Sequence, residues 1–513
     1  MEKNRRKQNS IRNAIISTFS NILTLLIGFV AQAIFIKTLG PDYLGLNGLF
    51  SNIVSALAIV ELGIGPAIVY NLYKPLSENN KEEIKSLLNF YKKAYNIIAL
   101  IIFVLGIILM PMLPLFVNTK LNINIYIVFL LFLLDVISSY LLSYKRSIIQ
   151  ADQKNYIINL VHIGYIVILN IIQILILLIN KNYFLYLIVR VIMRFLENVV
   201  ITIIANKKYI YLKEKDLKPL SKNILEDIKQ KVKGLIFHKL GGIVVLSTDN
   251  IIISKFLGTV VVGFYSNYYM IINALTLLFS QIFTSITASV GNLLVKESKE
   301  KSYSVFKVIM FINFWIYGFA SICIYILIEP FITIWVGSQF ILDKFVLIIL
   351  VLNFYISGMK ASIGIYKDAA GIFWEDRYIP IIESIINIVF SIILVKIYGL
   401  AGVFLGTFIS SLVVVLYSLP HYVFEKVFDK KAIIYFKQYF KYFIVTLITL
   451  VLITLITNFI NIESIFIKLI LDSVICFVVI NLNFFILFRN TEEFKYIYNM
   501  IKDILKVKVK KNE

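Results

Sequence analysis

Four basic side chains lie inside long apolar stretches of the sequence, where a free charge is costly. Arg190 and Arg194 are one helical turn apart and Glu197 follows three residues later, so all three share one helix face. Lys239 and Lys360 stand in two later apolar stretches. Because such a residue costs about 2.5–3.5 kcal/mol at the bilayer centre, these four cations indicate a polar cavity or internal ion pairs. A cationic cavity binds anions, and the planar fork of arginine suits bidentate contact with phosphate.

The sequence leaves an alternative open for each of these cations. Arg194 and Glu197 can form an ion pair inside the protein, and Lys239 or Lys360 can extend to the lipid headgroups. We expect the two lysines in the inner third of the bilayer and Arg190 with Arg194 at middle to outer depth. In this interpretation, the four cations line one substrate-binding cavity.

Carboxylates in apolar segments form a second set of candidates. A carboxylate held in an apolar environment can exchange a proton or a cation, so Glu61 and Asp249 are candidates for coupling to H⁺ or Na⁺. Alternatively, Glu61 pairs with a cation or contacts backbone groups freed by a kink. Asp135, Glu383 and Asp472 also lie in apolar segments, and the sequence assigns them no role.

A cluster of helix-weakening residues follows Glu61. Gly63, Gly65 and Pro66 fall within one apolar segment. Proline removes a helix hydrogen bond and introduces a clash, so this segment is predicted to bend or break near its inner end. The bend acts either as a hinge between conformations or as a static kink.

The elements that position these residues are long apolar segments. The 513 residues are 59% hydrophobic, with a mean hydropathy of +0.85. Since about 20 apolar residues cross a hydrocarbon core of about 30 Å, we expect an all-α polytopic membrane protein. About fourteen transmembrane helices are predicted, near 14–36, 44–70, 94–117, 122–144, 157–179, 183–205, 235–256, 260–290, 306–328, 342–365, 379–397, 399–419, 440–460 and 464–488.

Basic residues are distributed unequally between alternate loops. If the N-terminus is cytoplasmic, the inside segments hold 40 of the 51 lysines and arginines, and the outside segments hold seven. Because positively charged loops stay in the cytoplasm, both termini are predicted to be cytoplasmic. The outside loops are short, and the longest is expected at 329–343. The same pattern explains the net charge of +21 without nucleic-acid binding, since no polar domain carries a basic patch.

The sequence repeats itself at an offset of 218 residues. Lys37-Thr-Leu-Gly40 followed by Gly45 matches Lys255-Phe-Leu-Gly258 followed by Gly263. The offset spans six predicted helices, an even number, so both copies face the same way across the membrane. This predicts two six-helix lobes in parallel repeat, an arrangement found in secondary transporters. The expected divisions are an N-lobe at 1–206, a linker at 207–233, a C-lobe at 234–420, two added helices at 421–490 and a basic tail at 491–513.

Two predicted cytoplasmic segments are amphipathic and rich in lysine. They are the linker 207–233 and the tail 492–513. Basic amphipathic segments bind anionic membrane lipid, which is therefore an expected partner. A solvated linker and tail is the alternative.

No metal or cofactor site is predicted. Cys323 and Cys476 lie in apolar segments and are expected to pack in the core, and the three histidines are scattered. The basic N-terminus resembles a signal peptide. However, the apolar stretch behind it continues to about Phe35 without a clear cleavage site, so it is interpreted as a retained first helix.

Three stretches carry a family resemblance. Residues 35–50 read FIKTLGPDYLGLNGLF, residues 61–69 read ELGIGPAIV and residues 145–156 read KRSIIQADQKNY. This pattern resembles the polysaccharide-transport branch of the multidrug/oligosaccharidyl-lipid/polysaccharide exporter superfamily, which contains the Wzx-type oligosaccharide flippases. The resemblance covers most of the chain. The motifs are specific to the branch and not to a substrate.

The resemblance implies a two-lobed transporter, with a fold like that of multidrug exporters, and not an enzyme. Members move an undecaprenyl-diphosphate-linked oligosaccharide across the bacterial cytoplasmic membrane for surface polysaccharide biosynthesis. The sugar and diphosphate pass through a hydrophilic cavity by alternating access while the lipid tail stays in the bilayer. Implied partners are the lipid-linked oligosaccharide, a polysaccharide polymerase and glycosyltransferases.

Three other functions remain open at this stage. A membrane polysaccharide polymerase or ligase handles similar lipids but needs an external catalytic surface, for which the short outside loops leave little room. A drug or cation exporter of the same superfamily usually carries cations, which a cavity rich in arginine and lysine disfavours. A flippase for the peptidoglycan precursor lipid II is expected to carry more cations in its first helix, which has none after Arg12.

Overall fold

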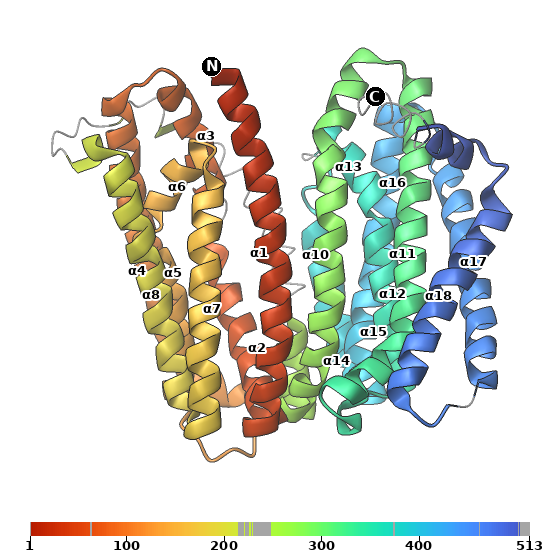
Figure 1. Cartoon of the computed structure of the whole chain (residues 1–513), viewed down its shortest axis with the longest axis horizontal. Helices are drawn as coiled ribbons and strands as arrows, with labels where there is room; N and C mark the ends of the chain where they lie inside the picture. The colour runs from red at the N-terminus through yellow and green to blue at the C-terminus, as the bar shows by residue number, and fades with distance from the viewer. Residues whose placement is uncertain are drawn as a thin grey trace, which may run out of the picture. The chain divides into compact units, whose positions relative to one another are not determined.

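The computed structural model describes residues 2–61, 64–213, 248–372, 375–460 and 462–500, together with residues 220, 225, 226, 228 and 502 (Figure 1). Nearly all of these residues are in helices joined by short turns, and none of those described forms a strand. By their internal contacts the residues divide into two compact units, Met1–Gly263 and Phe264–Glu513.

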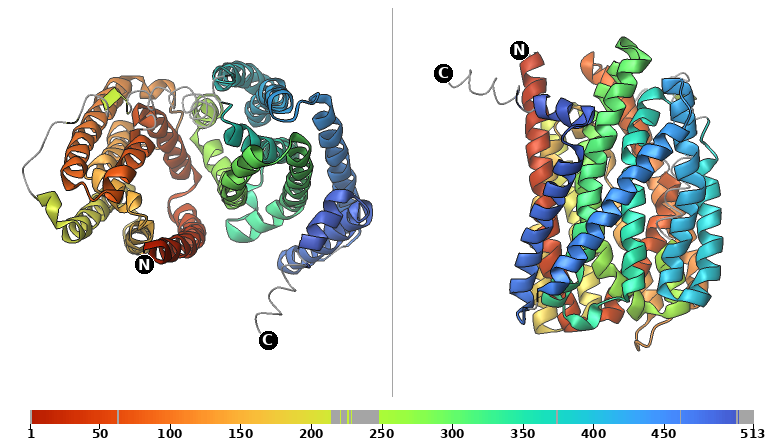
Figure 2. Two further views of the ribbon diagram at one scale, coloured as in Figure 1. Left: turned by 90° about the horizontal axis from the view of Figure 1, so that it is seen from above. Right: turned by 90° about the vertical axis from the view of Figure 1, so that its right-hand side faces the viewer.

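The first unit is a helix bundle (Figures 1 and 2). Helix α1 packs along α7, while α8 packs against both α5 and α7, and α3 contacts α4 and α6. Its elements are α1 (Glu2–Leu39), α2 (Pro41–Leu57), η1 (Ala58–Glu61), α3 (Ile64–Ser77), α4 (Lys81–Leu109), η2 (Met110–Leu115), α5 (Ile125–Tyr140), α6 (Tyr144–Ala151), α7 (Asn155–Ile179), α8 (Tyr183–Lys208), η3 (Ile210–Lys213) and the helical residues 248–257.

The second unit is a bundle in which α11 packs against α12, α17 and α18, and α14 forms a tight pair with α15. Stacked aromatic rings such as Phe314 and Tyr442, 4.3 Å apart, fill its interior. Its elements are α10 (Thr259–Lys296, which begins in the first unit), α11 (Lys299–Trp335), η4 (Ser338–Phe340), α12 (Lys344–Met359), α13 (Ala361–Ala370), α14 (Ile379–Tyr398), α15 (Leu400–Ser410), η5 (Ser411–Val415), α16 (Leu416–Val423), η6 (Phe424–Phe428), α17 (Ile433–Phe459) and α18 (Ile465–Phe488).

Each of the fourteen predicted segments coincides with helix, except 235–256, of which only the last residues are described. Ten described helices are long and apolar enough to cross a membrane, and the pair α5 and α6, bent by 44°, makes an eleventh if it is one span. The segment 44–70 is divided among α2, η1 and α3, and α8 carries five charges, at least three of them in any 18 consecutive residues. These two features explain why both segments fall short of that criterion.

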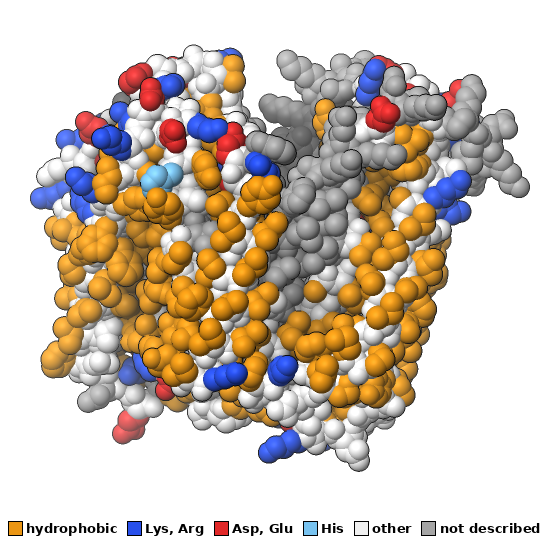
Figure 3. Space-filling view, turned by 180° about the vertical axis from the view of Figure 1, so that it is seen from behind, with side chains coloured by type: hydrophobic (Ala, Val, Ile, Leu, Met, Phe, Trp, Pro, Cys, Tyr) orange, Lys and Arg blue, Asp and Glu red, His pale blue; other side chains and the backbone are white. Residues whose placement is uncertain are grey.

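Side chains on the face seen in Figure 3 follow the distribution expected of membrane helices. Hydrophobic side chains cover the middle of the described helices, and charged side chains gather near the helix ends. Exposed apolar residues continue along whole helices, as in α18, where Ile470, Val474 and Phe477 are each more than half exposed. A surface of this kind is stable against lipid and unstable in water.

Polar side chains determine where several helices begin. Asn80, Asn124, Asn182 and Ser298 each accept a hydrogen bond from a backbone N–H two or three residues later. Such caps satisfy backbone donors that have no partner within the helix. They fix the first turns of α4, α5, α8 and α11.

One predicted loop is shorter than expected. The sequence placed an outside loop at 329–343, but α11 continues through Pro330 to Trp335, and η4 occupies part of the remainder. Pro330 lies inside α11, where it removes one backbone hydrogen bond of the last two turns.

The two copies of the sequence repeat have the same local structure. Gly40 ends α1 with a φ of 89°, and Gly258 ends the helical residues 248–257 with a φ of 94°. Both φ values lie in the range that favours glycine, and in both copies a long helix starts at the next residue. The repeat therefore marks one helix–turn–helix element that occurs twice.

Within the first unit, these two elements contact each other reciprocally. A Cβ atom on Gly45 would lie 1.8 Å from the backbone oxygen of Thr259, and one on Gly263 would lie 2.1 Å from that of Pro41. Each glycine thus admits the backbone of the other copy. The two copies lie side by side, as a repeat with both copies facing the same way requires.

Helices α14 and α15 also approach closely through glycine. A Cβ atom on Gly402 would lie 2.0 Å from the backbone oxygen of Leu394, and one on Gly406 would lie 2.1 Å from Ser391 Oγ. Small residues four apart allow two helix backbones to pack tightly in lipid.

We expect Gly402→Ala to lower the stability of the purified protein by about 1–3 kcal/mol, because the methyl group forces two backbones apart. The melting temperature in detergent measures the effect. Gly164→Ala in α7 is the matched control, since nothing lies within 4 Å of its added methyl group. Equal melting of both variants would show that the α14–α15 contact does not need glycine.

The predicted topology is tested by cysteine labelling. In a background with Cys323→Ala and Cys476→Ala, a membrane-impermeant maleimide should label Ser338→Cys in intact cells and spare Lys431→Cys until the cells are lysed. Both positions are exposed, so accessibility depends only on the side of the membrane. Labelling of Lys431→Cys in intact cells contradicts cytoplasmic termini.

Candidate functional site

Four consecutive helices of the first unit bring charged side chains together inside the bundle. They are α5, α6, α7 and α8. Helix α6 leaves α5 at 44° through a turn in which Leu142 has a φ of 67°. This turn carries Arg146 to Glu197 of α8, against which α6 also packs.

Asp135 of α5 joins the two arginines of α8. Its Oδ2 atom lies 2.8 Å from Arg190 Nη2, and its Oδ1 atom lies 3.6 Å from Arg194 Nε. The carboxylate is enclosed, with 5% of the side chain exposed, whereas the arginine side chains are 28% and 26% exposed. One buried anion therefore orients two cations that stand one turn apart.

Glu197 of α8 is the second enclosed anion, and its side chain has no exposed surface. Its Oε2 atom lies 3.1 Å from Arg146 Nη2 and 3.3 Å from Arg194 Nη1, and its Oε1 atom lies 3.0 Å from His162 Nδ1. Arg194 thus bridges Asp135 and Glu197. The ion pairs, together with the hydrogen bond of His162, link α5, α6, α7 and α8 into one cluster, which we call the arginine cluster.

Neighbouring side chains fix the orientation of the guanidinium groups. Arg190 lies over the ring of Phe132 at 5.0 Å, and Arg194 lies over the ring of Tyr165 at 4.8 Å. Arg146 Nε donates to Asn198 Oδ1 at 2.9 Å. Stacking and charge-assisted hydrogen bonds of this kind hold a guanidinium plane in place.

The arginine cluster carries one positive charge in excess when His162 is neutral, because three arginines face two carboxylates. The anions are enclosed and the cations are about one quarter exposed, so the accessible face is cationic. A guanidinium has five N–H donors, and those that do not contact Asp135, Glu197 or Asn198 remain for an anionic ligand. The arrangement suits binding of a phosphate-like group.

The structure joins some of the predicted residues and adds others. Arg190, Arg194 and Glu197 lie together, and the ion pair between the last two, kept open as an alternative, is present. Sequence reasoning missed Asp135 as their partner, although its place in an apolar segment was a signal. It also missed Arg146 and His162.

The remaining predicted cations fall elsewhere. Lys360 follows α12 in the second unit and interacts electrostatically with Glu383 of α14, which accepts a hydrogen bond from Ser411 Oγ at 3.2 Å. Lys239 lies outside the described residues, as does Gly63.

Glu61 lies where the helix breaks. It ends η1, and α3 begins at Ile64, so the predicted interruption near Gly65 and Pro66 is present. Tyr140 Oη donates to Glu61 Oε2 at 3.2 Å. A Cβ atom on Gly65 would lie 3.0 Å from Glu61 Oε1, so the glycine leaves room for the carboxylate.

Asp249 lies in the helical residues 248–257, where several polar atoms lack partners. Its buried Oδ1 atom makes no hydrogen bond, and the same holds for Asn250 Oδ1 and Ser254 Oγ. Across the described part of the chain, no group of three or more His, Cys, Asp or Glu side chains is arranged to hold a metal ion.

Comparison with known proteins identifies the family. A family model described as polysaccharide biosynthesis protein matches residues 10–290, more than half of the chain. The chain belongs to this family. No curated protein matches the sequence.

Solved structures show what fold this polysaccharide biosynthesis protein has. It resembles the lipid II flippase MurJ in an inward closed conformation, with 20% identity, a TM-score of 0.65 and coverage of 94% of this chain and 99% of MurJ. It also resembles an inward-facing multidrug resistance MATE family transporter of the MOP superfamily (16% identity, TM-score 0.54, 78% and 95% coverage) and the Vibrio cholerae MATE transporter VcmN (13%, 0.55, 80% and 94%). The fold is that of polytopic membrane transporters.

We expect Asp135→Asn to destabilise this protein by about 1–3 kcal/mol, because it leaves two partly buried arginines without their shared anion. Asp472→Asn in α18 is the matched control. Its carboxylate is equally enclosed, but unlike Asp135 it forms no ion pair with any residue that the structure describes, so neutralising it should be neutral or stabilising. Melting of both variants in detergent measures the difference. If Asp135→Asn melts like the wild type, the ion pairs do not stabilise the bundle.

Proposed function

We propose that this protein is a flippase that moves an undecaprenyl-diphosphate-linked oligosaccharide across the cytoplasmic membrane by alternating access, for surface polysaccharide biosynthesis. The observation that carries the proposal is the arginine cluster, a cationic face held within membrane-spanning helices. Membership of the polysaccharide biosynthesis family and the transporter fold support the same conclusion.

The cluster suits a diphosphate for a physical reason. Arg190 and Arg194 are oriented by Asp135 and by aromatic rings before any ligand binds. Binding of an anion to preoriented donors loses little conformational entropy. The enclosed carboxylates also limit the attraction to one net positive charge, so the site binds the diphosphate and can release it on the other side. Lys239 and Lys360 are proposed as further cations of the cavity.

Coupling to H⁺ or Na⁺ is proposed at Glu61 and Asp249. The unpartnered Asp249 Oδ1 and its neighbours Asn250 Oδ1 and Ser254 Oγ support a cation-exchanging role, because buried oxygens without donors attract a proton or cation. Glu61 beside the interrupted helix supports a link between ion binding and bending at Gly65.

The proposed setting is a bacterial cytoplasmic membrane, with both termini in the cytoplasm. Proposed partners are the lipid-linked oligosaccharide, anionic lipid at the basic segments, a polysaccharide polymerase and glycosyltransferases. Genes for glycosyltransferases beside this one would support the assignment.

Two related functions compete with this proposal. A lipid II flippase handles the same diphosphate chemistry, and MurJ has a similar fold. A multidrug exporter has a similar fold as well, but a cationic face repels the cationic compounds that such exporters commonly carry. The first alternative is tested by expressing this protein in cells depleted of MurJ. Sustained growth of those cells would indicate that lipid II is the cargo.

The mechanism predicts that Arg190→Ala and Arg194→Ala each reduce export of the lipid-linked sugar at least about tenfold. One charge-assisted hydrogen bond contributes about 1.5–3 kcal/mol, and 1.4 kcal/mol corresponds to a factor of ten. Lysine at either position should restore export in part, because it keeps the charge but loses the planar fork. Polymer at the cell surface is measured at matched membrane levels of each variant.

Arg489→Ala, at the end of α18 in the second unit, is the control for removal of an arginine as such. Export should stay normal in this variant. Normal export by both Arg190→Ala and Arg194→Ala would show that these arginines only stabilise the bundle, and the site assignment would then be wrong.

A further inference from the structure

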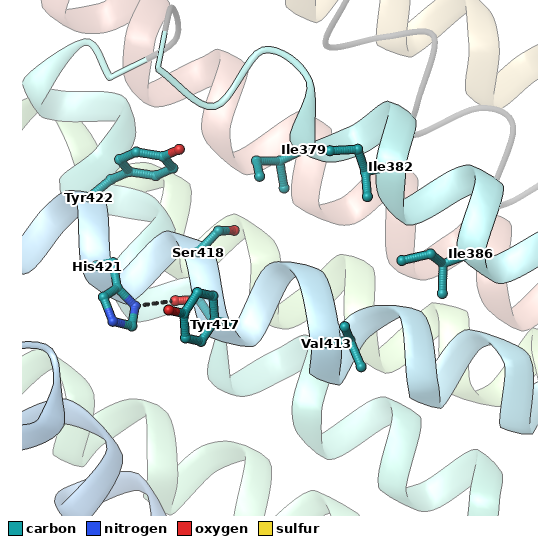
Figure 4. Close-up of a pocket in the computed structure, with 8 residues that line it drawn as sticks. All are labelled: Ile379, Ile382, Ile386, Val413, Tyr417, Ser418, His421 and Tyr422. Carbon is teal, nitrogen blue, oxygen red and sulfur yellow. Dashed lines mark hydrogen bonds between the residues drawn. The ribbon is translucent and has the colours of Figure 1, made fainter.

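A groove runs between α14 and α16 in the second unit (Figure 4). Its volume is about 430 Å³, within the range of small-ligand sites, about 300–1,000 Å³. It belongs to the second unit, whereas the arginine cluster belongs to the first. Its lining residues are Ile379, Ile382 and Ile386 of α14, Val413 of η5, and Tyr417, Ser418, His421 and Tyr422 of α16.

The lining of this α14–α16 groove is polar at one end and apolar at the other. Figure 4 shows Ser418, His421 and Tyr422 toward one end, with Ile386 and Val413 at the opposite end. Helix α14 begins at the polar end of the groove, and α16 and η6 end there. The groove is therefore amphipathic along its length, like a lipid.

Polar atoms at the first end have unused hydrogen-bonding capacity. Ser418 is 7% exposed, and its Oγ atom has no partner. His421 Nδ1 is 2.6 Å from the backbone oxygen of Tyr417, so it is the donor nitrogen, and Nε2 is the acceptor of the neutral ring. A buried hydroxyl without a partner costs free energy unless a ligand supplies one.

The backbone around the groove departs from a regular helix. The segments η5 and η6 on both sides of α16 are π-helical, and Pro420 lies inside α16. A π-turn widens a helix, and proline removes one backbone hydrogen bond. These irregularities lie beside the groove and recur at functional sites in other helices.

Exposed apolar side chains border the open side of the groove. Its lining residues Ile382, Val413 and Tyr417 are 44%, 59% and 62% exposed, and the neighbouring Ile385 is 57% exposed. On a membrane-spanning helix, exposed apolar side chains contact lipid chains. Apolar side chains exposed in this way suit contact with an acyl chain.

The polar end of the groove offers hydroxyl donors and no net charge. Along the chain, the residues before and at the start of α14 (366–378) and those after α16 (424–431) contain five basic and five acidic side chains. Because these charges are equal in number, the polar end of the groove does not attract anionic headgroups more strongly than zwitterionic ones. Hydroxyl and imidazole groups recognise the phosphodiester itself, which membrane phospholipids share.

We propose that the α14–α16 groove binds one glycerophospholipid, with its phosphodiester at Ser418 and His421 and one acyl chain along Ile382, Ile386 and Val413. The Ser418 hydroxyl and the tyrosine hydroxyls of Tyr417 and Tyr422 donate to phosphate oxygens. His421 Nε2 accepts from a headgroup hydroxyl or ammonium. The bound lipid fills the space that the irregular α16 leaves beside α14.

Native mass spectrometry of the delipidated full-length protein tests this proposal. Phosphatidylethanolamine, phosphatidylglycerol, diacylglycerol and undecaprenyl phosphate are added separately, and the bound fraction is measured. Ile382→Trp fills the groove. Ile385→Trp places the same ring on the same helix at an exposed position that does not line the groove, and is the matched control. Ser418→Ala removes the buried hydroxyl with little change in volume.

We expect the wild type and Ile385→Trp to retain one tightly bound phospholipid of either headgroup, and Ile382→Trp to lose it. Ser418→Ala should weaken binding about 2–10-fold, the effect of one hydrogen bond. Diacylglycerol, which lacks the phosphate, should bind at least tenfold more weakly. Either phospholipid should also raise the melting temperature of the wild type but not of Ile382→Trp.

Three results would overturn the proposal. Equal phospholipid retention by Ile382→Trp and Ile385→Trp would place the lipid elsewhere. Equal binding of diacylglycerol would exclude recognition of the phosphodiester. Stronger binding of undecaprenyl phosphate than of either phospholipid would identify a polyprenyl lipid as the occupant.

Discussion

Two enclosed carboxylates, Asp135 and Glu197, hold three arginines inside the helix bundle of the first unit. Lipid cannot solvate a charge, so each arginine must find its anion within the bundle. Because the two anions stand on α5 and α8 and the cations on α6 and α8, the ion pairs also fix how these helices are rotated against each other. Three arginines without these anions would be too costly to insert into a membrane. Paired with the anions, they can present a cationic face.

In the second unit, some buried asparagines bond to the backbone of a neighbouring helix. Asn313 Nδ2 donates to the backbone oxygens of Gly358 and Met359, where α12 ends, and Asn353 Nδ2 donates to that of Phe404. These bonds tie neighbouring helices together without net charge.

Hydropathy predicted the helices well, since the length of an apolar run reports directly on membrane crossing. Spacing along one helix placed Arg190, Arg194 and Glu197 on one face, because that relation is local. The pairing with Asp135 was not predictable, since it depends on how α5 and α8 rotate and pack. The π-helical segments around Pro420 escaped prediction for a related reason: apolar residues fit a π-turn and an α-turn equally well.

The reciprocal contacts of Gly45 and Gly263 have an evolutionary consequence. Each glycine meets the backbone beside the other copy's glycine, at Thr259 and Pro41, as the same residue does on the two sides of an isologous dimer. A single ancestral segment with one such glycine would have satisfied both contacts in a homodimer. In a fused chain the two positions could diverge, but a side chain at either one would collide with the backbone of the other copy. The pair therefore keeps, within one polypeptide, the reciprocal contact that a two-fold axis produces in a dimer.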